Sequence, residues 1–130
     1  MYVCIDKYGK LIGTYNYQPG RIFPVAYNLY VDGNEYLYMY VNGSSVDYYS
    51  SGKVYKYGDA TVEYLSDGRF YRIGSFCFDY LSSGRLYKLG ESTFDYYGYG
   101  SKEGRYYKIG NTVFDYYGDG RLYKIGDNYF

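Results

Sequence analysis

The chain repeats one template of about sixteen residues from Val46 onwards, and this repeat limits its fold more than any other feature. Five copies follow one another: VDYYSSGKVYKYGDAT, VEYLSDGRFYRIGSFC, FDYLSSGRLYKLGEST, FDYYGYGSKEGRYYKIGNTV and FDYYGDGRLYKIGDNY. The fourth copy is longer, by a four-residue insertion from Tyr99 to Lys102. A unit this short cannot bury an apolar face by itself, so stacked neighbours must share a core. Residues 46–130 are therefore expected to form an array of like units.

Each copy has the composition of a β-hairpin. Most copies carry a Ser-Gly or Asp-Gly pair near the middle, and every copy carries another glycine near its end. The segments between the glycines are rich in aromatic residues, above all in the 26 tyrosines, which favour strands. A pair such as Asp119-Gly120 is typical of a two-residue type I′ turn. The predicted fold is all-β: an antiparallel meander of hairpins in a single extended or coiled sheet.

A two-residue first turn decides which residues face one another across the hairpin. In the last copy it pairs Phe114 with Ile125, Asp115 with Lys124, Tyr116 with Tyr123 and Tyr117 with Leu122. The same closure pairs opposite charges in every copy: Asp47 with Lys56, Glu63 with Arg72, Asp79 with Lys88, Asp95 with Lys108, and Asp115 with Lys124. Opposite charges facing each other across strands contribute about 0.2 to 1 kcal/mol per pair, so the agreement of five copies supports this register.

The second turn, at the glycine near the end of each copy, leaves two closures open. A four-residue loop stacks the tyrosines in one straight row: Tyr48, Tyr55, Tyr64, Tyr71, Tyr80, Tyr87, Tyr96, Tyr107, Tyr116 and Tyr123. A two-residue type II′ turn slips each copy by two residues and lets the sheet coil; it puts Arg69, Arg85 and Arg105 opposite Tyr80, Tyr96 and Tyr116. We favour the straight register, because the slipped one places Asp79, Asp95 and Asp115 opposite Phe70, Leu86 and Tyr106.

The two faces of the predicted sheet differ in polarity. One carries ladders of Tyr, Phe and Ile and is expected to be buried. The other alternates charges with larger side chains: Leu81, Leu86, Tyr97, Tyr106, Tyr117 and Leu122. Because a tyrosine ring packs while its hydroxyl stays in water, this second face remains compatible with solvent.

Residues 1–45 depart from the template but keep its hairpin signals, and we treat the 130 residues as one domain. Asp32-Gly33 and Asn42-Gly43 are expected turns, and the segment before them holds both prolines, Pro19 and Pro24. Atypical first repeats are typical of a capping unit. No such unit follows at Phe130, so the last strand is expected to be an open edge that pairs with another chain.

Composition argues against an enzyme, a cofactor and a metal site. The chain has no histidine, which removes the usual general base and the commonest metal ligand, and its carboxylates recur in a regular row rather than at one place. Cys4 and Cys77 form no CxxC pair. The 14 basic and 14 acidic residues cancel. Without an apolar segment that could span a membrane or act as a secretory signal, the expected location is the cytoplasm.

The segment FDYYGDGRLYKIG resembles the YD repeats of Rhs-type proteins, over roughly residues 46–130. The shared features are Tyr-Asp followed by Gly-Arg within a hairpin. The chain differs from that family in its shorter period and in the spacing of Asp115 to Gly120, five positions instead of three. The resemblance implies a structural shell built of hairpins, with no catalytic residues to carry over.

Three classes of function follow from these features. The first is a structural protein that associates through its sheet edges. The second is a binding module that presents tyrosines to glycans or peptides; its candidate residues are the loop tip at Tyr99 and Lys102 and the side chains of Tyr97, Tyr106 and Tyr117. The third is a binder of single-stranded nucleic acid, whose bases would stack on tyrosine rings while Arg69, Arg85, Arg105 and Arg121 contact the phosphates. It is disfavoured because each cation has a matching carboxylate.

Overall fold

The computed structural model describes residues 1–34, 36–41, 46–98 and 104–130 and confirms an all-β chain of antiparallel hairpins. The N-terminal strands form a sheet of their own, with the order β2-β1-β5-β4-β3. Its strands are β1 (Tyr2–Ile5), β2 (Leu11–Tyr15), β3 (Phe23–Ala26), β4 (Leu29–Val31) and β5 (Leu37–Tyr40). No helix in the described residues is long and apolar enough to cross a membrane.

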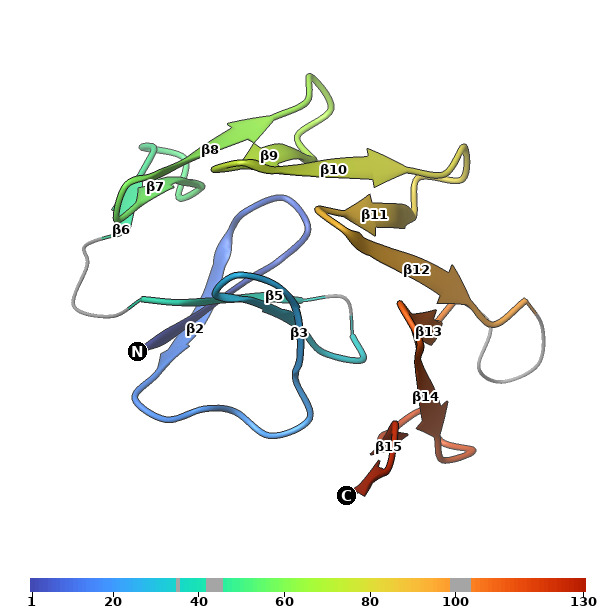
Figure 1. The fold of residues 1–130 in the computed structure, drawn as a ribbon. Coiled ribbons are helices and arrows are strands. Elements are labelled where there is room, and N and C mark those ends of the chain that lie inside the picture. Colours follow the sequence, from blue (N-terminus) through green and yellow to red (C-terminus); the bar gives the residue numbers. More distant parts are fainter. Residues whose placement is uncertain (35, 42–45, 99–103) are drawn as a thin grey trace.

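The repeats form a second, 11-stranded sheet in which each strand lies beside its neighbours in sequence. Its strands are β6 (Val46–Tyr48), β7 (Val54–Tyr57), β8 (Ala60–Tyr64), β9 (Phe70–Ile73), β10 (Phe76–Tyr80), β11 (Leu86–Leu89), β12 (Ser92–Tyr96), β13 (Tyr106–Ile109), β14 (Thr112–Tyr116), β15 (Leu122–Ile125) and β16 (Asn128–Tyr129). Figure 1 shows this sheet curving as an open arc around the N-terminal sheet. We call it the long sheet.

In four of the five repeats the first turn is a three-residue loop rather than the predicted type I′ turn; in the fourth repeat a longer segment, partly outside the described residues, joins Tyr97 to Arg105. In the last repeat the Tyr117 N–H donates to the Arg121 carbonyl and the Gly120 N–H donates to the Tyr117 carbonyl. Gly120 has a φ of 93°, whereas Asp119 is not among the described residues with positive φ. This is a type I turn closed by a glycine bulge, which needs a single left-handed residue. The prediction failed because an Asp-Gly pair suits both turns.

The five predicted charge pairs are confirmed as facing positions, but the pairing shifts by one residue nearer the turn. Asp115 faces Lys124, as expected, while Tyr116 faces Leu122, so Tyr123 is an extra residue in its strand. The predicted Tyr116–Tyr123 and Tyr117–Leu122 pairs are therefore wrong. The same shift occurs in the hairpins of the other repeats.

This one-residue shift redistributes the tyrosines between the two faces. The extra residue of each strand points outward, and four of them are exposed: Tyr55, Tyr71, Tyr87 and Tyr107. The residue before it turns inward, so Tyr106 and Leu122 are buried, at 2% and 6% exposure, although both were expected on the outer face. The straight row of ten tyrosines consequently does not form.

The second turn is the two-residue closure, so the favoured straight register is wrong and the slipped one is right. Ile125 faces Asn128 across Gly126-Asp127, and Gly126 has a φ of 59°, as a type II′ turn requires. The aspartates that this register was expected to place opposite apolar residues, such as Asp79 opposite Phe70, are not paired with them. Backbone pairing at this turn covers two residue pairs in each repeat, after which the strands diverge.

One hydrophobic core joins the two sheets. Val3, Ile5 and Leu29 of the N-terminal sheet are fully buried in the same cluster as Ile73 and Phe94 of the long sheet. Burying a side chain of this size contributes about 1.5 to 3 kcal/mol. The N-terminal strands thus fill the hollow of the arc (Figure 1), where sequence suggested a cap at one end.

Hydrogen bonds secure the N-terminal hairpins. At the predicted Asp32-Gly33 turn, the largely buried Asp32 carboxylate accepts bonds from the backbone N–H groups of Asn34 and Tyr36 and from the Tyr38 hydroxyl. Between the sheets, the Ser92 hydroxyl donates to the Val25 carbonyl at 2.6 Å. The predicted Asn42-Gly43 turn lies outside the described residues.

Candidate functional site

The sequence-predicted surface residues that the structure describes differ in their exposure. Tyr106 is 2% exposed and packs on Phe94 and Phe114, so its ring lies in the core and not on the outer face. Tyr97 is partly buried, and its hydroxyl donates to the Phe114 carbonyl. Tyr117 is 40% exposed and packs on the Tyr123 ring. The other two candidates, Tyr99 and Lys102, lie outside the described residues.

A contact between consecutive repeats recurs along the concave side of the long sheet. The Arg69 guanidinium, just after a first-turn glycine, lies over the ring of Tyr80 in the next repeat, with 4.2 Å between Cζ and the ring centroid. The Tyr80 hydroxyl donates to the Phe70 carbonyl at 2.7 Å. We call this combination the clasp. It has two parts: a cationic side chain that lies over the ring of a tyrosine in the next repeat, and a hydrogen bond from the hydroxyl of that tyrosine to the backbone carbonyl of the residue after the cation.

The cation–ring contact of the clasp recurs between four successive pairs of repeats, and its hydroxyl–carbonyl bond is seen at the first three of them. Its cation–ring contacts are Lys53–Tyr64 at 4.3 Å, Arg69–Tyr80 at 4.2 Å, Arg85–Tyr96 at 5.5 Å and Arg105–Tyr116 at 5.6 Å. The hydroxyls of Tyr64 and Tyr96 donate to the Val54 and Leu86 carbonyls. Burial raises the pKa of the Tyr64 and Tyr80 phenols well above their usual range, which keeps them protonated as donors. The clasp therefore links repeats where the backbone ladder has ended.

Each edge of the long sheet carries one half of a clasp. At one edge, Arg121 occupies the template position of Arg69; at the other, Tyr48 occupies that of Tyr80. Both arginines bind the aspartate of their own turn at 2.8 Å, yet the Arg69 side chain is 25% exposed and that of Arg121 is 65% exposed. Arg69 packs on the Tyr80 ring of the following repeat, whereas Arg121 lies over the Tyr117 ring of its own turn at 4.9 Å.

A pocket of about 490 Å³ opens where the first turns of the long sheet approach the N-terminal sheet. Its apolar lining comes from both sheets and includes Val31, Leu37, Phe70, Phe78 and Tyr106, all buried. Pockets of this size with an apolar lining and few polar groups are typical of small-molecule sites.

The charges at the mouth of this pocket have one sign. Lys7, Arg69 and Arg85 line it, and no carboxylate does so among the residues that the structure describes. Asp67, beside the pocket, binds Arg69. The corresponding residue of the next turn is Ser83, whose hydroxyl accepts a long 3.5 Å bond from the Arg85 backbone N–H. Sequence analysis missed this pocket, because its walls come from segments far apart in the chain.

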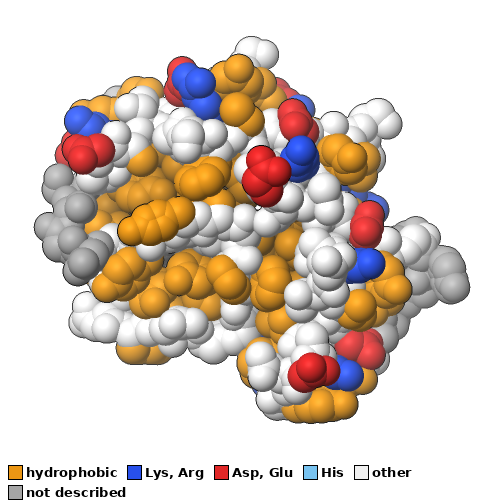
Figure 2. All heavy atoms as spheres, in the orientation of Figure 1, with side chains coloured by type: hydrophobic (Ala, Val, Ile, Leu, Met, Phe, Trp, Pro, Cys, Tyr) orange, Lys and Arg blue, Asp and Glu red, His pale blue; other side chains and the backbone are white. Residues whose placement is uncertain are grey.

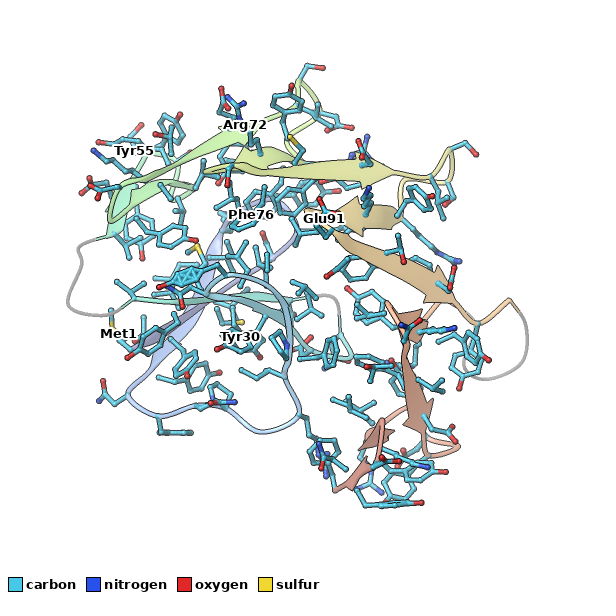
Figure 3. The ribbon with its side chains drawn as sticks, in the orientation of Figure 1. Met1, Tyr30, Tyr55, Arg72, Phe76 and Glu91 are labelled. Carbon is cyan, nitrogen blue, oxygen red and sulfur yellow. The ribbon has the colours of Figure 1, made fainter. Side chains whose placement is uncertain are left out.

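Figure 3 places the remaining chemical groups. Arg72 and Tyr55 project outward from the arc, while Phe76 points into the space between the sheets. Figure 2 shows apolar side chains gathered in that space and charges spread along the outer rim. Burial raises the pKa of the Cys4 thiol to about 11, and Cys77 is exposed. No cluster of three or more metal-ligating side chains occurs in the described parts of the chain.

Comparison with known proteins identifies no relative: no family model, curated protein or solved structure matches the chain.

Proposed function

We propose that this chain is a non-enzymatic structural protein that assembles head to tail, each copy docking the last repeat of its long sheet on the first repeat of the next copy. The observation that carries the proposal is that the two sheet edges hold complementary halves of the clasp. Each of the four internal junctions joins a cation and a tyrosine ring, three of them add the bond from the tyrosine hydroxyl to a backbone carbonyl, and the two edges offer the same groups divided between them.

The edge at β16 supplies the cation and the carbonyl. Asp119 binds the Arg121 Nε as Asp67 binds that of Arg69, and the Arg121 guanidinium lies over the Tyr117 ring of its own turn, at 4.9 Å from the ring centroid. The Leu122 carbonyl stands where the Phe70 carbonyl accepts the Tyr80 hydroxyl. Beyond them lies the two-residue strand β16, with Tyr129 69% exposed. Exposed strand edges of this kind are templates for pairing with another chain.

The edge at β6 supplies the tyrosine. β6 pairs with β7 on one side, and its other side faces no strand among the described residues. The Tyr48 ring is 38% exposed, whereas Tyr80 and Tyr96 at the same template position are packed against the core. Placing Arg121 of one copy over Tyr48 of the next repeats the contact made by Arg69 and Tyr80.

Such a junction is heterologous, since two different surfaces meet, and it propagates into filaments or closed rings. One cation–π contact contributes about 0.5 to 2 kcal/mol, so a single junction is expected to be weak. Interfaces below about 1,000 Å² are typical of transient association. Assembly should therefore depend strongly on concentration.

Size-exclusion chromatography with light scattering tests the proposal across a wide range of protein concentrations. We expect the mean mass to rise with concentration for the natural chain and to stay that of a monomer for Arg121→Ala and for Tyr48→Ala. Tyr71→Ala is the matched control, because Tyr71 is 46% exposed, against 38% for Tyr48, but belongs to no edge. A natural chain that stays monomeric, or edge variants that assemble like the control, would refute the proposal.

A second candidate, a platform for extended glycans, is favoured by the outward tyrosines. Tyr55, Tyr71, Tyr87 and Tyr107 recur once per repeat, hence every second strand, at intervals of roughly 10 Å. Evenly spaced rings suit a linear sugar polymer, whose apolar faces stack on aromatic side chains. Saturable binding of a β-linked oligosaccharide to monomeric protein, lost in a Tyr71→Ala and Tyr87→Ala double variant, is the expected result. Equal binding by that variant would exclude the platform.

The cytoplasmic location stays part of this proposal. The two cysteines, Cys4 and Cys77, are free, which suits a reducing compartment.

A further inference from the structure

We propose that the pocket between the first turns of the long sheet and the N-terminal sheet binds a small amphiphilic anion, that is, an apolar body carrying one carboxylate, sulfonate or phosphate group. This inference is independent of the assembly proposed above, because neither Tyr48 nor Arg121 lines the pocket.

The apolar body has a ready-made place. Phe70 and Phe78 stack on each other at 5.1 Å, and with Val31 and Leu37 they form a wall that closes the pocket toward the core. At about 490 Å³ the volume suits a molecule of two or three fused or linked rings, or a short acyl chain. Burying such a body removes apolar area from water, which is the main source of affinity in sites of this kind.

The charged group has a place as well, at the mouth. Arg85 lines the pocket, and its guanidinium carbon is 5.5 Å from the centroid of the Tyr96 ring, which also lines it. Arg85 stands in the template position of Arg69 and Arg121, whose charges are balanced by Asp67 and Asp119. Ser83 replaces that aspartate. The Arg85 turn thus lacks the built-in anion of the other two.

A second cation, from the N-terminal sheet, lines the same pocket. Lys7, in the turn between β1 and β2, lines the mouth together with the partly exposed Tyr8 ring. An anion held between Lys7 and Arg85 gains from both charges, more so because the adjoining apolar wall lowers the local dielectric constant. No carboxylate competes for these cations among the described lining residues. The site therefore selects for negative charge as well as for an apolar body.

The decisive variant is Ser83→Asp, which installs the aspartate of the neighbouring turns. In those turns the carboxylate accepts bonds from the arginine backbone N–H and from Nε, at 3.0 to 3.1 Å and 2.8 Å. We expect Ser83→Asp to keep or raise the melting temperature while weakening anion binding at least tenfold. Loss of binding without loss of stability separates this result from misfolding.

The probe is anilinonaphthalene sulfonate, titrated against the full chain at low protein concentration and followed by its fluorescence. Saturation at one molecule per chain, with an affinity that falls as salt is added, is expected. Lys7→Gln should weaken binding several-fold. Lys88→Gln removes an equal charge from the outer face of the repeat that contains Arg85, and it should leave the affinity for the sulfonate unchanged. Uncharged N-phenylnaphthylamine should bind equally to the natural chain and to Ser83→Asp.

Three results would overturn the proposal: binding of the sulfonate that does not saturate, equal affinity in Ser83→Asp and the natural chain, or equal loss of the charged and uncharged probes in Ser83→Asp. The same titration in a Tyr48→Ala background keeps the outcome separate from assembly. Unchanged saturable binding in that background is the expected result even if the head-to-tail proposal fails.

Discussion

The two sheets differ in how their strands find their partners. In the long sheet every strand pairs with the strands next to it in sequence, and four of the five repeats close their first turn with the same three-residue loop. In the N-terminal sheet β1 pairs with β5, more than thirty residues away, and Val3, Cys4 and Ile5 are buried in succession. The comparison shows that turns and pairing between sequence neighbours form the long sheet, whereas packing between segments far apart in sequence forms the core that covers its concave face. A hairpin array alone has nothing to cover its concave face.

The largest expected effect comes from breaking the contact between the two regions. Phe114 of the long sheet is fully buried and packs edge-on against Phe23 of the N-terminal segment at 5.4 Å. Phe114→Ala should lower the free energy of unfolding by about 3 to 5 kcal/mol, because it leaves a cavity. Urea unfolding followed by tyrosine fluorescence and by circular dichroism checks this.

Phe130→Ala is the matched control, since Phe130 holds the same template position but is 42% exposed. A cost for Phe114→Ala no larger than that of the control would show that the two regions are energetically separate.

A smaller but sizeable effect is expected where the β1–β2 turn meets the first repeats. Gly9 has a φ of 79°, and a Cβ there would lie 2.0 Å from the Tyr64 hydroxyl oxygen. Its carbonyl accepts a bond from the Val54 N–H. Gly9→Ala combines backbone strain with a clash and should cost about 1 to 3 kcal/mol. Gly20→Ala, where no atom lies within 4 Å, is the control.

Thermal melts of both glycine variants sharpen the result. If Gly9→Ala melts like Gly20→Ala, the turn does not pack on Tyr64 as described.

The clasp should contribute less per site. Tyr80→Phe keeps the ring under Arg69 but removes the hydroxyl that bonds the Phe70 carbonyl, so we expect a loss of about 0.5 to 1.5 kcal/mol. Tyr71→Phe removes a hydroxyl from an exposed ring and should cost nothing measurable. Equal unfolding midpoints for the two variants in urea would show that the hydrogen bond of the Tyr80 hydroxyl does not stabilise the fold.

Alkaline pH should weaken the fold through the buried phenols. Burial raises the pKa of Tyr57 to about 12 and that of Tyr64 further still, whereas unfolded tyrosines ionise near about 10. Their contribution is complete below about pH 10 and is lost as the pH rises, because the unfolded chain gives up these protons first. Unfolding midpoints from about pH 8 to about pH 11 should fall, and less steeply in Tyr57→Phe. Unfolding midpoints that do not change with pH would contradict the burial of these phenols.

The smallest effect belongs to the charge pairs. Glu63 and Arg72 face each other on the outer surface and form an ion pair, with both side chains more than 40% exposed. Reversing either charge should cost about 0.2 to 1 kcal/mol, and exchanging both should restore part of the loss. A double variant no more stable than the sum of its singles would count against this register.

Sequence alone predicted the parts of the structure that depend on repeated local pattern. The charge pairs, such as Asp115 with Lys124, survive because they lie beyond the turn, where one residue of loop length is compensated by one extra residue in the strand. The same shift made the faces of Tyr106 and Leu122 unpredictable. The slipped register looked unfavourable because it was judged as if the two strands stayed paired along their whole length. In the structure they pair over two residues and then separate, and the sequence of the strands does not reveal this separation. The pocket needed the N-terminal sheet to be placed inside the arc.

Mixing the two edge variants tests the head-to-tail account most directly. Arg121→Ala keeps its Tyr48 edge and Tyr48→Ala keeps its Arg121 edge, so one junction forms between them and neither copy extends further. Each variant alone is predicted to scatter light as a monomer, and an equimolar mixture at high concentration as a dimer with no larger species. A mixture that remains monomeric, or variants that dimerise on their own, would contradict the account.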